Sequence, residues 1–282
     1  MTTTMTSFAI AVGVADIRRY PDASSELVTQ ALMNVPATAG EINGEWTHVT
    51  LSDYTGWIRT DQLDEPVSKG YCKVGENCST PLQLMAVINK PRTTLLPDAE
   101  DNNAPGTLYL STVLPALNTA EPERVQVVLP GERSGWLIRD DIVIRQGEEV
   151  YPRAATEVIT DHARAFLGRP YLWGGTSWEG IDCSGLVQLC YRMGGYTIPR
   201  DADQQHNVLS YRVARADMQE GDLIFFGSQE ITHVAMALNH KEYIHAEGQN
   251  YNYVVINSFD PIDSHYYPRL DQIVWGIKRV AA

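Results

Sequence analysis

An internal repeat in the first half of the chain limits the fold more than any other feature of the sequence. Asp53-Tyr-Thr-Gly-Trp-Ile-Arg-Thr-Asp-Gln-Leu63 is echoed by Glu132-Arg-Ser-Gly-Trp-Leu-Ile-Arg-Asp-Asp-Ile142, and the two Trp residues are 79 positions apart. Upstream, Tyr20-Pro-Asp22 precedes Leu96-Pro-Asp98 by 76 positions. Short alternating runs such as Trp46–Leu51 lie between turn residues and are typical of small β-domains. Two diverged copies of one β-unit of about 60 residues fit this spacing.

The chain changes character in its last part. Thr156–Leu167 has the apolar spacing of a helix and stops at Gly168. Three later runs are interpreted as strands because they are short, apolar and bounded by turn residues. They are Asp222–Phe226, Ile231–Leu238 and Glu242–Ala246. A helix followed by antiparallel strands predicts an α+β domain.

Domain boundaries are expected near 67–70 and near 145–148, where short polar stretches with glycine separate these patterns. The chain then divides into a first small β-domain over 1–68, a second one with its linker over 69–148, and an α+β domain over 149–282. A length of 282 residues is sufficient for three such domains.

The acidic composition excludes some classes of partner. The formal net charge is −13, and a chain this acidic repels polyanions, so we expect neither nucleic acid nor an anionic membrane surface as a partner. No run of eighteen apolar residues occurs, so no membrane-spanning helix is expected. The N-terminus lacks the basic start of a secretory signal, which predicts a cytoplasmic protein, or a secreted one if a leader has been removed. We expect a monomer.

Cys183, in the run Asp182-Cys-Ser-Gly185, is the strongest candidate for chemistry. A helix is expected from here to Gly194, with Asp182 as its N-cap. The thiol then lies in the first turn, where free N–H groups and the positive end of the helix dipole lower a thiol pKa and can bind an oxyanion. We interpret Cys183 as a nucleophile, because a run of Asp, Cys, Ser and Gly is a poor setting for a structural core cysteine.

Two histidines downstream can supply the base and the orienting group that a cysteine nucleophile requires. His233 lies in one expected strand and His245 in the next, with Asn239–Glu242 as the hairpin turn between them. If position 235 opposes position 245, both histidines lie on one face as diagonal neighbours, whereas a slip by one residue would put them on opposite faces. A satisfied core histidine and a three-ligand zinc site on these strands are the alternatives.

The other cysteines are given structural interpretations. Cys190 follows Cys183 by seven residues, inside an apolar stretch of the same expected helix, and is interpreted as a core residue. Cys72 and Cys78 could close a small disulfide loop, but ordinary thiols are the expectation in a cytosolic protein. No second pair completes a zinc site with them.

Six motifs in the last part of the chain, taken in order, resemble the NlpC/P60 family of papain-like cysteine peptidases. They are Pro170-Tyr-Leu-Trp-Gly-Gly175, Asp182-Cys-Ser-Gly-Leu186, Pro199-Arg200, Gly221-Asp-Leu-Ile-Phe-Phe226, His233-Val-Ala235 and Ile244-His-Ala246. The resemblance covers about residues 155 to 280. It implies a papain-like domain that cuts peptidoglycan stem peptides and needs no cofactor.

The same resemblance implies roles for four residues. Cys183 maps onto the nucleophile of the family, His233 onto its base, and His245 onto the third polar residue. Tyr171, from the Pro-Tyr-x-Trp-Gly-Gly motif, maps onto a tyrosine that helps to form the oxyanion hole.

The repeated Gly-Trp-(Ile/Leu) pattern resembles bacterial SH3 (SH3b) domains, so we expect two small SH3-like β-barrels followed by a papain-like α+β catalytic domain. This combination resembles the γ-D-glutamyl-L-diamino acid endopeptidases, which act on stem peptides with a free N-terminal L-Ala. That resemblance implies a pocket for the amino end of the substrate. Its candidates in the catalytic domain are Asp182, Ser184, Asp201 and Arg200, and its candidates in the first SH3b domain are Tyr54 and Glu26.

Elementary electrostatics agrees with such a pocket, because a free α-ammonium needs carboxylates such as Asp182 and Asp201. Arg200 could pair with a substrate carboxylate or with a neighbouring Asp. Other functions are a cell-wall-binding SH3b protein whose thiol is unused, or an amidase or acyl transferase on the same catalytic core. The sequence does not distinguish Lys from diaminopimelate as the diamino acid.

Overall fold

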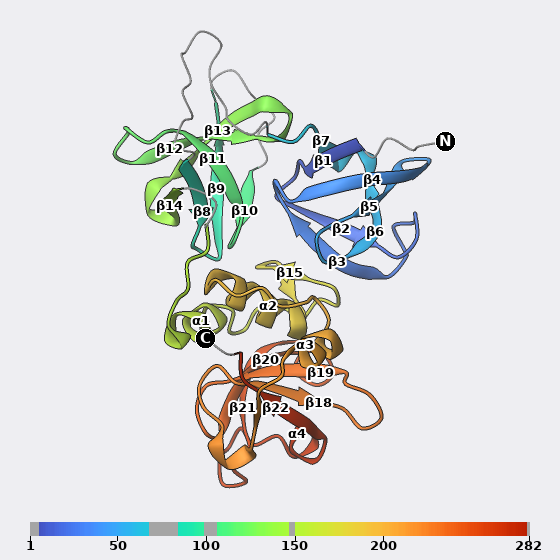
Figure 1. The fold of residues 1–282 in the computed structure, drawn as a ribbon, viewed down its shortest axis with the longest axis vertical. Helices are drawn as coiled ribbons and strands as arrows, with labels where there is room; N and C mark the ends of the chain where they lie inside the picture. Colours follow the sequence, from blue (N-terminus) through green and yellow to red (C-terminus); the bar gives the residue numbers. More distant parts are fainter. Residues whose placement is uncertain (1–5, 68–83, 99–105, 147–149, 281–282) are drawn as a thin grey trace. The chain divides into compact units, whose positions relative to one another are not determined.

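The structure is a computed structural model that describes residues 6–67, 84–98, 106–146 and 150–280 (Figure 1). Contacts between Cα atoms group the chain into two units, Met1–Val150 and Tyr151–Ala282. Cys72 and Cys78 lie outside the described residues. The expectation that they are ordinary thiols, rather than a disulfide, therefore stays a prediction.

The first unit contains two sheets of seven strands each. The strands of the first sheet are β1 (Thr6–Ile10), β2 (Val14–Arg18), β3 (Leu27–Leu32), β4 (Pro36–Asn43), β5 (Trp46–Thr50), β6 (Thr55–Arg59) and β7 (Leu63–Asp64). Those of the second sheet are β8 (Leu84–Ile88), β9 (Arg92–Pro97), β10 (Thr107–Tyr109), β11 (Val113–Asn118), β12 (Arg124–Leu129), β13 (Arg133–Ile138) and β14 (Ile142–Gln146).

The two sheets have the same topology. The first has the strand order β3-β2-β6-β5-β4-β1-β7, and the second has the order β10-β9-β13-β12-β11-β8-β14. Each strand of one copy therefore has the place of its counterpart in the other copy. The internal repeat of the sequence is a repeat of an SH3-like fold, as predicted.

The glycine of the repeated Gly-Trp pattern has one physical role in both copies. A Cβ atom added to Gly56 of β6 would lie 2.6 Å from Ile17 Cγ2 on β2. A Cβ atom added to Gly135 of β13 would lie 2.8 Å from Leu95 Cδ1 on β9. Glycine lets the two strands approach closely at this point, which explains why the pattern recurs.

Each sheet packs around its own apolar core, because alternate residues along a strand point to the same face. Ile17 and Ile58 are fully buried in the first core, and Leu108 and Leu137 in the second.

The second unit has α+β architecture, as predicted (Figure 1). Its helices are α1 (Thr156–Ala165), α2 (Cys183–Met193), α3 (Ala202–Val208) and α4 (Pro268–Gln272). Its six-stranded sheet has the order β17-β22-β18-β19-β20-β21, formed by β17 (Arg212–Val213), β22 (Val274–Lys278), β18 (Leu223–Phe226), β19 (His233–Ala237), β20 (Glu242–Glu247) and β21 (Tyr253–Ser258). A separate short hairpin pairs β15 (Thr176–Ser177) with β16 (Gly180–Ile181).

Helix α2 is the central helix of this unit, and it packs against α1, β19 and β20. It is buried from Cys183 to Tyr191, and Cys190 is fully buried, which confirms its interpretation as a core residue. Because β19 and β20 carry His233 and His245, this packing brings the start of α2 and the two histidines into one region of the fold.

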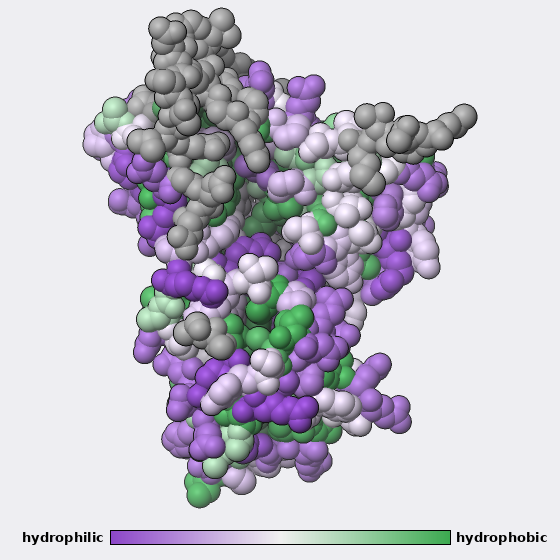
Figure 2. Space-filling model, viewed as in Figure 1, coloured by the Kyte–Doolittle hydropathy of each residue, from purple (hydrophilic) through white to green (hydrophobic). Residues whose placement is uncertain are grey.

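The predicted helix at 156–167 and the three predicted strands correspond to α1, β18, β19 and β20. Strands β17, β21 and β22 were not predicted. In the part of the chain that the structure describes, no helix has both the length and the apolar character needed to cross a membrane. The face drawn in Figure 2 is covered mostly by hydrophilic side chains, with hydrophobic ones gathered in smaller groups.

Candidate active site

Asp182 forms the N-cap of α2, as predicted. Its Oδ1 accepts a hydrogen bond from the backbone N–H of Gly185 at 2.7 Å. Cys183 is therefore the first residue of the helix, where backbone N–H groups have no acceptor within the helix. Its thiol is free and largely buried. An electron-rich atom at this position faces unpaired donors and the positive end of the dipole.

Two glycines let the segments around the thiol pack together. A Cβ atom on Gly185 would lie 2.5 Å from the carbonyl oxygen of Gly175, and a Cβ atom on Gly175 would lie 2.5 Å from that of Gly180. Both neighbours are backbone atoms, which cannot turn aside as the end of a side chain can. The glycines in these two motifs are therefore required by close packing.

His233 and His245 form a hydrogen-bonded pair. Strands β19 and β20 pair Met236 with Ile244, and in this register position 235 opposes position 245, which is the condition set by the sequence analysis. The histidines lie on one face as diagonal neighbours, with His233 Nε2 and His245 Nδ1 2.8 Å apart. His245 is fully buried and His233 is partly buried.

Asn257 belongs to the same array, and it is not among the residues predicted from the sequence. His245 Nε2 and Asn257 Oδ1 are 2.9 Å apart. The available signal was the β-branched run that precedes Asn257, together with the spacing of the three residues. Twelve residues separate His233 from His245, and twelve separate His245 from Asn257.

Burial governs the protonation of the two imidazoles. It lowers the pKa of His245 to about 4, although the hydrogen bond with Asn257 and the Glu247 carboxylate favour the charged form. It also lowers the pKa of His233 well below the usual value, and His245 and Arg269 add to this effect. Both imidazoles are therefore neutral at pH 7, which is the state that a general base requires.

Burial has the opposite effect on the thiol. It raises the pKa of Cys183 to about 12, and the Asp182 carboxylate adds to the shift, whereas the N–H groups of Val234 and Ser184 favour the thiolate. The expectation that the start of the helix lowers the thiol pKa is therefore wrong, because burial outweighs the N–H groups. The uncharged thiol is the resting form, and its proton has to pass to a base as the sulfur attacks. Val234 follows His233 in β19, so its N–H group connects the sulfur to the strand that carries the candidate base.

Tyr171 is held by contacts of its backbone and its ring. Its N–H donates to Asn252 O at 2.8 Å, and its ring packs on Gly248, where an added Cβ atom would lie 2.5 Å from Cε1. Burial raises the pKa of the phenol, and the neighbouring Cys183 and the Asp182 carboxylate add to this effect. The hydroxyl keeps its proton and can donate a hydrogen bond to an oxyanion.

Arg200 forms a buried ion pair with Asp182. Its Nη1 donates to Asp182 Oδ1 at 2.9 Å and its Nη2 to Oδ2 at 2.6 Å, with only 2% of Arg200 exposed. Nη1 also donates to Ser184 Oγ at 2.9 Å. Of the two partners considered for Arg200, the structure supplies the neighbouring Asp.

The other substrate-binding candidates lie in different surroundings. Asp201 is the partly buried N-cap residue of α3, and its charge acts on Arg200. In the first unit, Tyr54 packs against the core of the first sheet, and Glu26 Oε2 accepts a hydrogen bond from Arg19 Nε at 2.5 Å. The role of Tyr54 and Glu26 in substrate binding stays a prediction.

The arrangement is suited to nucleophilic acyl transfer. It combines a thiol at a helix N-terminus, neutral imidazoles that can accept a proton, and a protonated phenol. Among the residues that the structure describes, no three His, Cys, Asp or Glu side chains are grouped to hold a metal ion. His233 and His245 direct nitrogen atoms at each other instead.

Comparisons with known proteins match both units. The family model described as NlpC/P60 family matches residues 168–272, which include α2 and β18 to β21. A model described as bacterial dipeptidyl-peptidase Sh3 domain matches residues 17–63, within the first sheet.

Two relatives match most of the chain. Dipeptidyl-peptidase 6 of Lysinibacillus sphaericus is 30% identical over 265 residues, which cover 91% of this chain and 92% of that protein. The γ-D-glutamyl-L-lysine dipeptidyl-peptidase of Bacillus cereus is 29% identical over 236 residues, which cover 79% of this chain and 68% of that protein.

One solved structure has the same fold along nearly the whole chain. It is the crystal structure of an NlpC/P60 family protein from Bacillus cereus, with a TM-score of 0.84 at 24% sequence identity. The similarity covers 97% of this chain and 99% of that one.

Proposed function

Since the chain belongs to the NlpC/P60 family of cysteine peptidases, we propose that it hydrolyses the bond between γ-D-Glu and the diamino acid of peptidoglycan stem peptides that have a free N-terminal L-Ala. The name of the Bacillus cereus relative supports the γ-D-glutamyl specificity. The observation that carries the proposal is the hydrogen-bonded pair of His233 and His245 on strands that pack against the helix opened by Cys183.

The first half of the proposed reaction forms a thioester. Cys183 Sγ attacks the γ-carbonyl carbon of D-Glu, and His233 takes the thiol proton. The resulting oxyanion is stabilised by the Cys183 backbone N–H and the Tyr171 hydroxyl. The C–N bond then breaks, and His233 returns the proton to the departing amine of the diamino acid.

The second half releases the enzyme. His233 takes a proton from a water molecule, whose oxygen attacks the thioester carbonyl carbon. The C–S bond breaks and the proton returns to the sulfur of Cys183, which leaves L-Ala-D-Glu as the free acid. His245 orients His233 throughout, and the chemistry uses only groups of the protein and water.

The charge of the cluster beside Cys183 supports recognition of an ammonium group. Asp182 and Asp201 contribute two negative charges and Arg200 one positive charge, so these three side chains together have a net charge of −1. Asp182 already accepts from Gly174 N, Gly185 N and both Nη atoms of Arg200. We therefore assign direct contact with the L-Ala ammonium to Asp201 rather than to Asp182.

Digestion of defined peptides tests this proposal. We expect L-Ala-γ-D-Glu-L-Lys or its diaminopimelate counterpart to give L-Ala-D-Glu and the diamino acid, identified by mass spectrometry. Acetylation of the L-Ala amine is expected to lower kcat/KM by about ten- to a hundredfold, because a hydrogen bond to a charged group contributes roughly 1.5–3 kcal/mol. Asp201→Asn is expected to reduce the difference between free and acetylated peptide, whereas Asp203→Asn, on the exposed side of the same helix, is the matched control.

Other outcomes identify the alternatives. Equal cleavage of free and acetylated peptides would contradict recognition of the amino end. A product that contains a new amide or ester would identify an acyl transferase. Binding to cell-wall sacculi without turnover of any stem peptide would identify a wall-binding protein.

A further inference from the structure

Asn257 extends the histidine pair by one strand. It lies in β21 and is 1% exposed, with its Oδ1 2.9 Å from His245 Nε2. Strands β20 and β21 pair His245 with Val255, so Asn257 is a diagonal neighbour of His245, just as His245 is of His233. The three side chains form one line of hydrogen bonds across three adjacent strands.

The orientation of the Asn257 amide is determined by its second partner. Its Nδ2 donates to the carbonyl oxygen of His265 at 2.9 Å, and a carbonyl can only accept. Oδ1 must therefore be the atom that faces His245, and it can only accept a hydrogen from His245 Nε2. The two contacts together therefore determine both the orientation of the Asn257 amide and the tautomer of the His245 imidazole, neither of which could be assigned from one contact alone.

The tautomer of His245 in turn determines the tautomer of His233. With its hydrogen on Nε2, a neutral His245 has an unprotonated Nδ1, which accepts the hydrogen of His233 Nε2. A neutral His233 with its hydrogen on Nε2 has its lone pair on Nδ1. That nitrogen is then the one that can accept a proton from the nucleophile.

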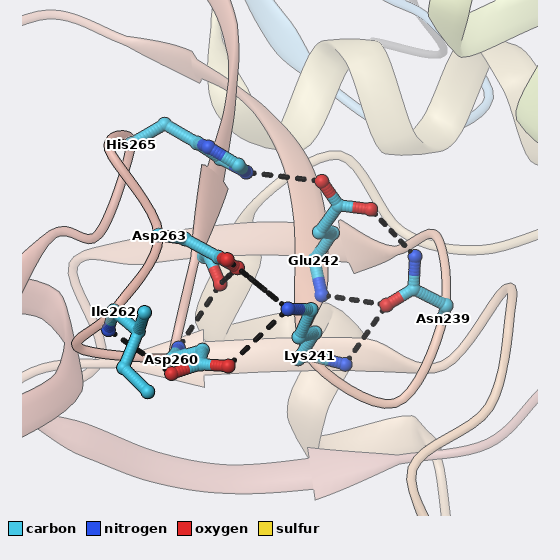
Figure 3. A network of polar contacts seen from close by, with 8 residues as sticks. Asn239, Lys241, Glu242, Asp260, Ile262, Asp263 and His265 are labelled. Carbon is cyan, nitrogen blue, oxygen red and sulfur yellow. Dashed lines mark hydrogen bonds and ion pairs between the residues drawn. The ribbon is translucent and has the colours of Figure 1, made fainter.

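The carbonyl that orients Asn257 belongs to His265, and the side-chain contacts of the loop around His265 are drawn in Figure 3. Lys241 Nζ donates to Asp260 Oδ2 at 3.2 Å and to Asp263 Oδ1 at 3.1 Å. His265 Nε2 lies 3.0 Å from Glu242 Oε1. These contacts join the loop to the hairpin turn before β20 and to the first residue of that strand, which carries His245. They therefore fix the position of the His265 carbonyl relative to the His245 imidazole.

We propose that Asn257 is a positioning residue that selects the Nε2–H tautomer of His245 and, through it, the tautomer in which Nδ1 of His233 is free to act as the base. This inference rests on the proposed catalytic role of His233. It does not depend on which peptide is cleaved.

Several titratable or charged groups surround the two imidazoles, and any pH profile has to be interpreted with them. Glu247 of β20 favours the charged form of His245, and Arg269 of α4 disfavours that of His233. The Tyr243 and Tyr267 rings contact His245, and the Tyr251 hydroxyl lies 3.4 Å from Asn257 Nδ2. The N-terminus of α2 contributes Cys183 and the Asp182–Arg200 pair. All of these groups are unchanged in the variants proposed below.

The most direct test is the tautomeric state of His245, from ¹⁵N chemical shifts of the imidazoles in the whole protein. The wild type is expected to show the Nε2–H form alone, and Asn257→Leu a mixture of both forms. The same variant is expected to lower kcat by about ten- to a hundredfold with little change in KM, since an orienting group is lost and no substrate contact is. Asn207→Leu, at an exposed Asn of α3, is the matched control and is expected to leave the tautomer of His245 as in the wild type.

Asn257→Asp provides an independent measurement and covers the case in which Asn257→Leu does not fold. A carboxylate at this position favours the charged imidazole, so the pair takes up a proton at higher pH. The rate of Cys183 alkylation can be measured without a peptide. The acidic limb of its pH profile, where the rate falls as the pH is lowered, is expected to move to higher pH by at least about one unit. Asn257→Ser, which keeps a small polar side chain without a carboxylate, is not expected to move it upward.

Two results would overturn the inference. One is an unchanged Nε2–H tautomer in Asn257→Leu. The other is a combined result in which Asn257→Leu and Asn257→Asp both lose thermal stability, while the acidic limb of the alkylation profile of Asn257→Asp stays at the wild-type pH. A purely structural role of Asn257 predicts this combination. If the tautomer and the acidic limb respond as expected while no stem peptide is cleaved, the inference holds and the proposed substrate is wrong.

Discussion

Replacement of Cys183 by alanine is expected to lower kcat on a stem peptide by at least about a thousandfold, because in the proposed reaction the thioester forms on this sulfur and Cys183, His233 and His245 act as a unit. The fold is expected to survive, since the substitution removes a single atom from the first turn of α2 and leaves the Asp182 N-cap in place. Turnover by mass spectrometry and thermal unfolding by circular dichroism, measured on the same purified sample, check both expectations.

Cys190 on the same helix supplies a control with the opposite behaviour. Its side chain is fully buried, away from the first turn, so Cys190→Ala creates a small cavity and is expected to lower the unfolding free energy by about 1 kcal/mol. Its kcat is expected to stay within about twofold of the wild type. Activity retained by purified Cys183→Ala would contradict the assignment of the nucleophile.

Arg200→Met is expected to lower the unfolding free energy by about 3–5 kcal/mol, because it leaves the buried Asp182 carboxylate without its countercharge. Both Nη atoms of the guanidinium bind this carboxylate, and the side chains are 2% and 10% exposed. Asp182 also caps α2, so loss of its partner is expected to disturb the first turn and reduce kcat as well. Urea unfolding followed by fluorescence measures the first effect and peptide turnover the second.

The control for this prediction is an exposed ion pair of the same unit. Arg215 Nη2 lies 2.8 Å from Asp271 Oδ1, with 43% and 26% of the two side chains exposed, so Arg215→Met is expected to cost no more than about 1 kcal/mol. The double variant Asp182→Asn/Arg200→Met is expected to be less destabilised than Arg200→Met alone, because no unpaired charge stays buried. If Asp182→Asn/Arg200→Met were less stable than Arg200→Met, the unpaired Asp182 carboxylate could not be the cause of the destabilisation.

The parts of the site that could be predicted from the sequence are those determined by local signals. The N-cap Asp, the apolar spacing and the closing glycines all indicate one helix, and α2 spans Cys183–Met193. The register of the two histidines follows from the turn between them, where Asn239 Oδ1 accepts hydrogen bonds from the N–H groups of Lys241 and Glu242, both at 2.9 Å.

The parts that could not be predicted depend on contacts between segments distant in sequence. Asn257 joins the array only because β21 pairs with β20, and its carbonyl partner His265 belongs to the following loop. The partner of Arg200 was left open because the pairing with Asp182 is decided by how the two segments pack. The repeat in the first unit predicted two like folds, but the order of their strands came from the structure.

The central claim is that Cys183 is the nucleophile and that His233 activates it. Its most direct test is the alkylation of the native protein by iodoacetamide at pH 7, followed residue by residue by mass spectrometry alongside peptidase activity. We expect activity to fall in step with modification of Cys183, Cys190 to stay unmodified, and His233→Ala to slow the modification of Cys183 by at least about tenfold. Full modification of Cys183 in a protein that still cleaves stem peptides would contradict the claim, as would a modification rate unchanged by His233→Ala.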